Sequence, residues 1–70
     1  MNFLEVTTSK GKKLLINVHS ILSIGEAVQE DKENDKNSII LLSNGAVYKV
    51  KEYYGYFASI LKWKEGVDWN

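Results

Sequence analysis

Alternating apolar and polar residues along the first two thirds of the chain predict five β-strands. Successive side chains of a strand point to opposite faces, so an alternation of period two is typical of a sheet with one buried face. The expected strands cover residues 2–8, 13–18, 21–28, 38–43 and 46–50. Gly25 lies inside the third of these segments, which indicates a bulge or a sharp bend at that point.

Turn signals separate these segments. Asn44-Gly45 predicts a two-residue hairpin between the last two strands, because such a connection requires positive φ at both central positions. A polar turn containing Gly11 joins the first two strands. Residues 17–20 break the alternation and predict a corner or a helical turn. Residues 29–37 are all polar and predict a mobile solvent loop.

Beyond the fifth strand the apolar period becomes helical, which predicts a helix over residues 51–64 and a short tail over residues 65–70. The apolar face of this helix has the spacing i, i+4, i+7 and i+8, with Tyr53, Phe57, Ile60 and Leu61. We therefore expect a single α+β domain over residues 1–70. Its architecture is a bent five-stranded antiparallel sheet or partial, SH3-like barrel, closed on one side by the C-terminal helix.

One hydrophobic core should be shared by the sheet and the helix. A chain of this length buries only about 60% of the surface that its unfolded form exposes, so each core residue counts. The expected core residues are Leu4, Val6, Leu14, Ile16, Ile21, Ile24, Ile40, Leu42, Val50, Phe57, Ile60 and Leu61.

The charge balance argues against a strongly electrostatic partner. Nine basic and nine acidic residues cancel, and every basic residue is lysine, so no guanidinium fork is present to grip phosphates or guanine edges. Three lysines of the first turn, Lys10, Lys12 and Lys13, nevertheless offer a nucleic-acid contact as the alternative function, with Lys49 and Lys51 as further candidates.

The absence of cysteine removes disulfides, thiolate metal ligands and a thiol nucleophile. This composition fits a reducing cytoplasm, and the N-terminus lacks the basic start and apolar stretch of a signal peptide. No segment approaches the roughly 20 apolar residues of a membrane helix. We expect a cytoplasmic protein without membrane insertion.

Candidate chemistry is sparse. Asp31, Glu33 and Asp35 alternate like the first ligands of a calcium loop, but Lys36 and Leu42 stand where that loop requires glycine and glutamate. We therefore expect a solvated charged loop instead of a metal site.

The only histidine, His19, has no partner for a ligand set or a general base, so a solvated or capping role is expected. The chain has no phosphate-binding glycine motif. The sequence therefore predicts no catalytic, cofactor-binding or metal-binding residue, no enzyme activity and no small-molecule substrate.

Aromatic residues form the remaining unusual concentration. Tyr54, Tyr56, Trp63 and Trp69 are candidates for an interaction surface, because Trp and Tyr dominate interface hot spots. Packing of the tail back onto the helix is the alternative for the two tryptophans. The leading hypothesis is a nonenzymatic protein-interaction module that acts through an open sheet edge or through these aromatic residues, as a homodimer or a subunit of a larger assembly.

The chain carries a series of strand and turn motifs in a recognisable order, followed by an amphipathic helix. The motifs are Thr7-Thr8, Gly11-Lys12, Leu15-Ile16-Asn17, Ile21-Leu22-Ser23-Ile24, Ile39-Ile40-Leu41-Leu42-Ser43-Asn44-Gly45 and Tyr48-Lys49-Val50-Lys51-Glu52. This order resembles the small FlbD-like (SwrD) flagellar proteins, with similarity over nearly the whole chain. The same hairpin pattern occurs in DNA-binding LytTR-type domains and in small proteins of gut bacteria and phages. The resemblance implies a bacterial or phage origin and an accessory or assembly role, and it brings no catalytic residues. The charged loop and the Trp-bearing tail depart from the flagellar pattern.

Overall fold

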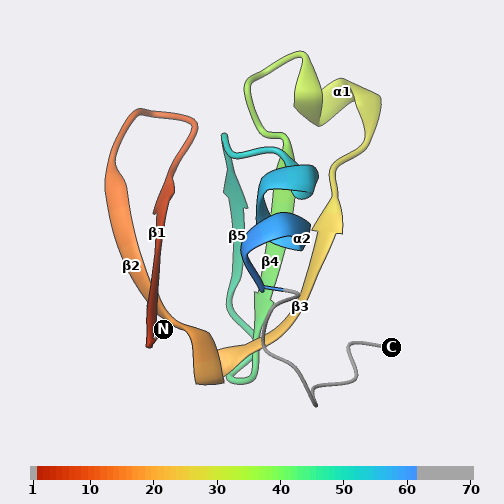
Figure 1. The fold of residues 1–70 in the computed structure, drawn as a ribbon. Helices are drawn as coiled ribbons and strands as arrows, with labels where there is room; N and C mark the ends of the chain where they lie inside the picture. The colour runs from red at the N-terminus through yellow and green to blue at the C-terminus, as the bar shows by residue number, and fades with distance from the viewer. Residues whose placement is uncertain (1, 62–70) are drawn as a thin grey trace.

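Two small antiparallel sheets and a C-terminal helix make up residues 2–61, the part of the chain described by this computed structural model (Figure 1). The first sheet pairs β1 (Phe3–Thr7) with β2 (Lys13–Asn17). The second has the order β3-β4-β5, formed by Ile21–Glu26, Ser38–Leu42 and Val47–Val50. The helical elements are η1 (Val18–Ser20), α1 (Gln29–Lys32) and α2 (Tyr54–Leu61).

The α+β class and the five strands are confirmed, but the single five-stranded sheet is wrong. β1 and β5 meet at one end only, through a bridge between Thr8 and Val50 and a 2.8 Å hydrogen bond from Lys51 N–H to Thr7 C=O. Beyond this point the first hairpin diverges from β5, so the sheets do not close into a barrel (Figure 1). The expected turn before β3 is confirmed as η1, which redirects the chain from one sheet to the other.

Both hairpin loops contain three residues, which corrects the two-residue turn predicted at Asn44-Gly45. Gly45 N–H donates to Leu42 C=O, and Gly45 alone has positive φ (93°), whereas Asn44 does not. Asn44 instead accepts the Ala46 N–H at its side-chain oxygen. The first loop repeats this design, because Gly11 N–H donates to Thr8 C=O and Gly11 has φ of 89°. This is the three-residue hairpin loop with glycine in the left-handed region.

The irregularity in β3 lies elsewhere than predicted. Gly25 pairs regularly with Ile39, and the register shifts between Ile21 and Ser23 instead. The bulge therefore contains Leu22, whose side chain is 63% exposed. A bulge turns a side chain out of the regular alternation, and here it directs an apolar residue to solvent.

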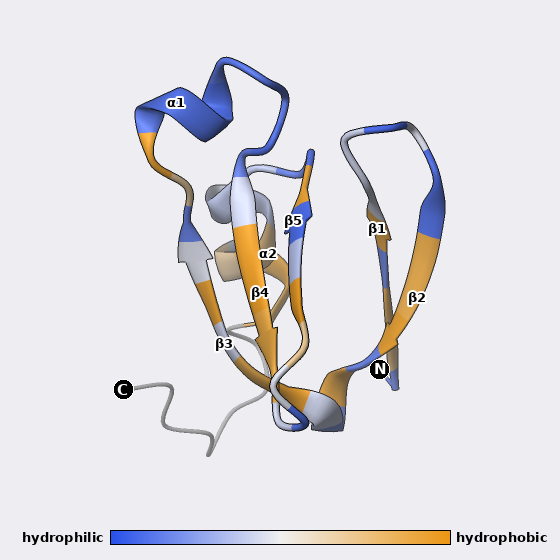
Figure 2. Ribbon diagram, turned by 180° about the vertical axis from the view of Figure 1, so that it is seen from behind, coloured by the Kyte–Doolittle hydropathy of each residue, from blue (hydrophilic) through white to orange (hydrophobic). Residues whose placement is uncertain are grey.

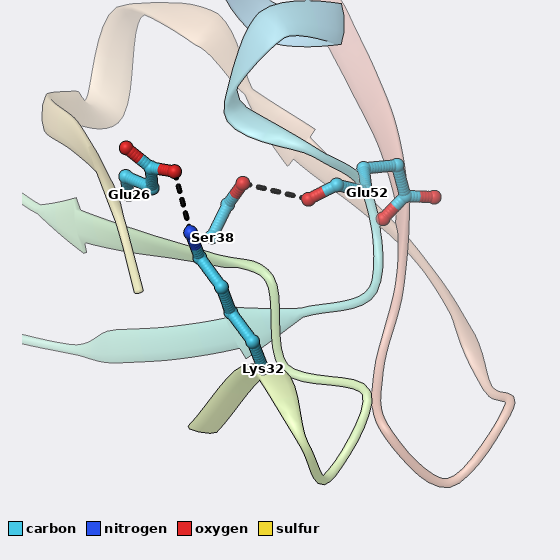
Figure 3. Close-up of polar contacts among 4 residues, drawn as sticks. All are labelled: Glu26, Lys32, Ser38 and Glu52. Atoms are coloured by element: carbon cyan, nitrogen blue, oxygen red, sulfur yellow. Dashed lines mark hydrogen bonds and ion pairs between the residues drawn. The ribbon is translucent and has the colours of Figure 1, made fainter. Parts of the chain in front are cut away.

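The polar segment 29–37, predicted as a solvent loop, contains a short helix, α1, over Gln29–Lys32, and only its remainder is turn or loop. Glu30 and Asp31 occupy the first turn and Lys32 the last, an arrangement that suits the helix dipole. Two ion pairs attach α1 to the second sheet, one from Lys32 to Glu26 (Figure 3) and one of 3.0 Å from Lys49 to Asp31. These pairs connect a segment without apolar anchors to the sheet (Figure 2).

α2 begins at Tyr54, three residues later than predicted, because Lys51 and Glu52 are engaged between the sheets. Phe57 and Leu61 are buried as predicted, but Tyr53 precedes the helix and is 69% exposed. Residues 62–64 of the predicted helix and the predicted tail lie outside the described residues.

Glu52 links the two sheets by polar contacts that we call the Glu52 clasp, formed by Thr7, Ser38 and Glu52. The Thr7 N–H and hydroxyl each donate to the Glu52 carboxylate at 2.9 Å. On the other sheet, the fully buried Ser38 hydroxyl donates to the Glu52 backbone carbonyl at 2.6 Å (Figure 3). The clasp thus provides hydrogen-bond partners for the polar groups of Thr7 and Ser38 at the place where the two sheets meet.

The predicted core is confirmed. Every expected member belongs to the hydrophobic cluster between the sheets and α2, and five of them are only partly buried: Leu14, Ile21, Ile24, Leu42 and Ile60. Val18, on η1, joins the cluster although the sequence analysis did not include it. Val18 is buried because η1 connects β2 of the first sheet to β3 of the second.

Candidate protein-interaction surface

β3 and α2 border a shallow hollow of about 140 Å³ on the surface of the described residues. We call it the β3–α2 hollow. β3 supplies three residues at its bulged end, and α2 supplies four residues from one helix face. The lining residues are Leu22, Ser23, Ile24, Tyr54, Phe57, Ala58 and Leu61.

The β3–α2 hollow forms because small side chains on the two elements lie next to large ones. Phe57 and Leu61 line the hollow although they are buried and belong to the hydrophobic core. The small side chains of Ala58 and Ser23 are exposed and leave space between the two elements. Leu22 stands exposed because of the bulge, and Tyr54 is 45% exposed.

The chemistry of the hollow is apolar with two hydroxyl groups. Among the described lining residues, only Ser23 and Tyr54 have a polar side chain, and in each it is a hydroxyl group. A pocket of this kind receives an apolar group and orients it by one or two hydrogen bonds. Its small volume suits one side chain rather than a cofactor.

Of the four aromatic residues predicted to form an interaction surface, the structure places only Tyr54 in the hollow. Tyr56 is also exposed, but two residues along a helix correspond to a rotation of about 200°, which directs it to the opposite side of α2. Its ring meets Phe57 edge-on, with the ring centroids 5.3 Å apart. Trp63 and Trp69 lie outside the described residues.

Leu22 and Ala58 were missed as surface residues by the sequence analysis. A regular alternation through β3 places Leu22 on the same face as Ile24 and does not predict that it protrudes. Its exposure depends on the bulge between Ile21 and Ser23. Ala58 carries no signal of its own, because its contribution is the space that its small side chain leaves.

The lysines divide into two groups. Lys10, Lys12 and Lys13 are all exposed at the tip of the first hairpin. Lys49 is instead paired with Asp31, and the backbone of Lys51 bonds to Thr7.

The other residues considered for chemistry are His19 and the acidic residues of the charged loop. The exposed His19 lies in η1, where its backbone N–H donates to the Asn17 side chain. Within residues 2–61, no three His, Cys, Asp or Glu side chains gather closely enough to hold a metal ion. None of the helices in this part of the chain has the length and apolar character to cross a membrane.

Comparison with known proteins finds no matching family model, no matching curated protein and no matching solved structure. The resemblance to FlbD-like proteins stays a prediction.

Proposed function

We propose that this protein is a nonenzymatic protein-interaction module and that the β3–α2 hollow receives its partner. The observation that carries the proposal is the exposure of apolar side chains around the hollow, above all Leu22 at 63%. Such exposure is costly in a small domain, where each apolar side chain left in water forgoes stabilisation of about 1.5–3 kcal/mol. An accessory or assembly role, as the FlbD-like resemblance implies, agrees with this proposal.

The partner that fits is an extended protein segment with one large apolar side chain. The side chain would enter the hollow and contact Leu22 and Tyr54, while the segment runs along the edge of β3 that has no neighbouring strand within residues 2–61. Ala27 N–H donates to the C=O of Asn37, the residue before β4, so by alternation the backbone groups of Ile24 and Glu26 point away from β4. These groups can pair with an added strand, as in other complexes formed by strand addition.

The test uses two matched substitutions on α2. Ala58→Arg fills the hollow, whereas Ser59→Arg places the same side chain on the neighbouring exposed position that does not line it. Peptides selected from a random display library on the wild-type chain should carry a large apolar anchor. Their affinity should fall at least about tenfold with Ala58→Arg, equivalent to about 1.4 kcal/mol, and stay within about twofold with Ser59→Arg.

Both variants should retain the wild-type circular dichroism spectrum, because both positions are exposed. Failure to select any peptide, or equal binding by the two variants, would contradict the proposal. Chemical shift changes confined to β3 and α2 would identify the same surface independently.

The basic tip does not favour a second function. Lys10, Lys12 and Lys13 are exposed, but exposed lysines are equally compatible with contact to water alone and with contact to a nucleic acid. The nucleic-acid alternative is therefore not proposed.

A further inference from the structure

β2 is an edge strand whose outer side has no neighbouring strand among the described residues (Figures 1 and 2). The hydrogen bonds at both ends of its ladder show which backbone groups are free. Thr8 N–H donates to Lys12 C=O, and Val18 N–H donates to Asn2 C=O. Since bonded residues alternate in an antiparallel ladder, the backbone groups of Lys13, Leu15 and Asn17 point outward.

This free edge has little of the protection that natural edge strands carry. The chain has no proline, and the regular register between β1 and β2 contains no bulge. The charge of Lys13 lies at one end of the strand. At its centre stands Leu15, which is 70% exposed, the highest value among the large exposed apolar residues of the described chain.

We propose that the outer edge of β2 binds the β2 strand of a second copy of this chain. The two strands would run antiparallel about a two-fold axis at Leu15. Leu15 would then face its own counterpart, and Lys13 would face Asn17 of the other copy. Asn17 is the N-cap of η1, so its carbonyl already accepts the first hydrogen bond of that helical turn. The remaining outward groups would form about four hydrogen bonds, and the hairpins would join into one four-stranded sheet, β1-β2-β2-β1.

The distribution of charge favours this register over a parallel one. A parallel pairing would set Lys13 beside Lys13 and bring the two basic tips together. In the antiparallel register the two Lys13 residues stand four residues apart along the strands, about 13 Å. This separation exceeds the Debye length of about 8 Å at physiological ionic strength, and the zero formal net charge adds no overall repulsion.

Apolar burial would act in the same direction. Leu15 would pack against Leu15 on the outer face of the new sheet, and the partly buried Leu14 would lie next to Ile16 of the other copy on the inner face. The contact is short, however, with five residues from each strand. It falls below the about 1,200 Å² of a standard interface, so we expect a dimer with a dissociation constant of about 10–100 µM.

The β2 edge and the β3–α2 hollow share no residue, so this inference does not depend on the proposed function. Either test can fail without the other.

Sedimentation velocity of the full chain between about 1 and 500 µM tests the proposal. The wild-type chain should pass from monomer to dimer in this range, and Leu15→Lys should remain monomeric at 500 µM. Phe3→Lys is the matched control, because Phe3 is also exposed on the outer face of this hairpin but belongs to β1. Its dimerisation should stay within about threefold of the wild type.

Disulfide trapping then tests the register, since the chain contains no cysteine of its own. Residues that form a bonded antiparallel pair have Cα atoms about 5.5 Å apart, within reach of a disulfide. Leu15→Cys should therefore give a covalent dimer on mild oxidation, at least about tenfold faster than Lys13→Cys or Phe3→Cys. A wild-type chain that is monomeric at all concentrations, a dimer that survives Leu15→Lys, or equal trapping at the three positions would overturn the proposal.

Discussion

At the scale of single residues, the two glycines in the hairpin loops determine how the chain reverses. Gly11 and Gly45 both occupy the third loop position, and both have positive φ. Both are recognisable as turn residues from the sequence alone, but the two-residue loop predicted at Asn44-Gly45 is wrong. That pair is compatible with either loop, and the choice depends on the Asn44 side chain, which bonds to Ala46 N–H instead of supporting a left-handed backbone.

Substitution of either loop glycine should therefore be costly. Gly11→Ala and Gly45→Ala should each lower the free energy of unfolding by about 1–2 kcal/mol, because a β-carbon disfavours the left-handed conformation. Gly25→Ala is the control, since Gly25 has ordinary φ and open space around an added β-carbon. It should change stability by less than about 0.5 kcal/mol. Urea unfolding followed by circular dichroism measures all three, and equal effects would refute the assignment.

At the scale of elements, the periodicity of apolar residues predicted which side chains pack into the core. Polar contacts, in contrast, determine where the helices begin and end. The period of 3.6 residues correctly placed Phe57 and Leu61 on the buried face of α2. It could not reveal that Lys51 and Glu52 are held between the sheets, which delays the helix start and leaves Tyr53 exposed. α1 was missed for a similar reason, because its attachment is by ion pairs and not by an apolar face.

The attachment of α2 should depend on Phe57, which is 1% exposed. Phe57→Ala should lower the free energy of unfolding by about 3–5 kcal/mol, enough to unfold much of a small domain at 25 °C. Tyr53→Ala removes a comparable ring from an exposed position and should cost less than about 1 kcal/mol. Thermal melts followed by far-ultraviolet circular dichroism compare the two. A cooperative melt of Phe57→Ala at the wild-type temperature would show that α2 is not part of the core.

At the scale of the whole molecule, the sequence predicted which residues form the core but not how the strands divide into sheets. The alternation of apolar and polar residues shows which side chains are buried. The same side chains are buried whether β1 pairs with β5 in one sheet or lies in a separate sheet. The division depends on a single bridge at Thr8 and Val50 and on the Glu52 clasp, whose partners are far apart in sequence. The β3–α2 hollow was unpredictable for the same reason, because it lies between elements and needs the bulge at Leu22.

The Glu52 clasp should carry part of the stability of the whole fold. Glu52→Ala leaves two Thr7 donors without their carboxylate and should cost about 1.5–3 kcal/mol. Glu52→Gln keeps a similar shape, one acceptor oxygen and an amide that can donate to the Thr7 hydroxyl, so it should cost less than about half as much. Chemical unfolding measures both variants. An alanine variant as stable as the wild type would show that the clasp is dispensable.

The single bridge between the sheets also bears on how this sequence can change over time. A one-residue shift in the pairing of two strands moves every side chain of the shifted strand to the opposite face. Here the β1-β2 ladder and the β4-β5 ladder are each aligned by their own glycine loop. A residue added to or lost from one of these loops would therefore change the pairing of its own hairpin and leave the pairing of the other hairpin unchanged.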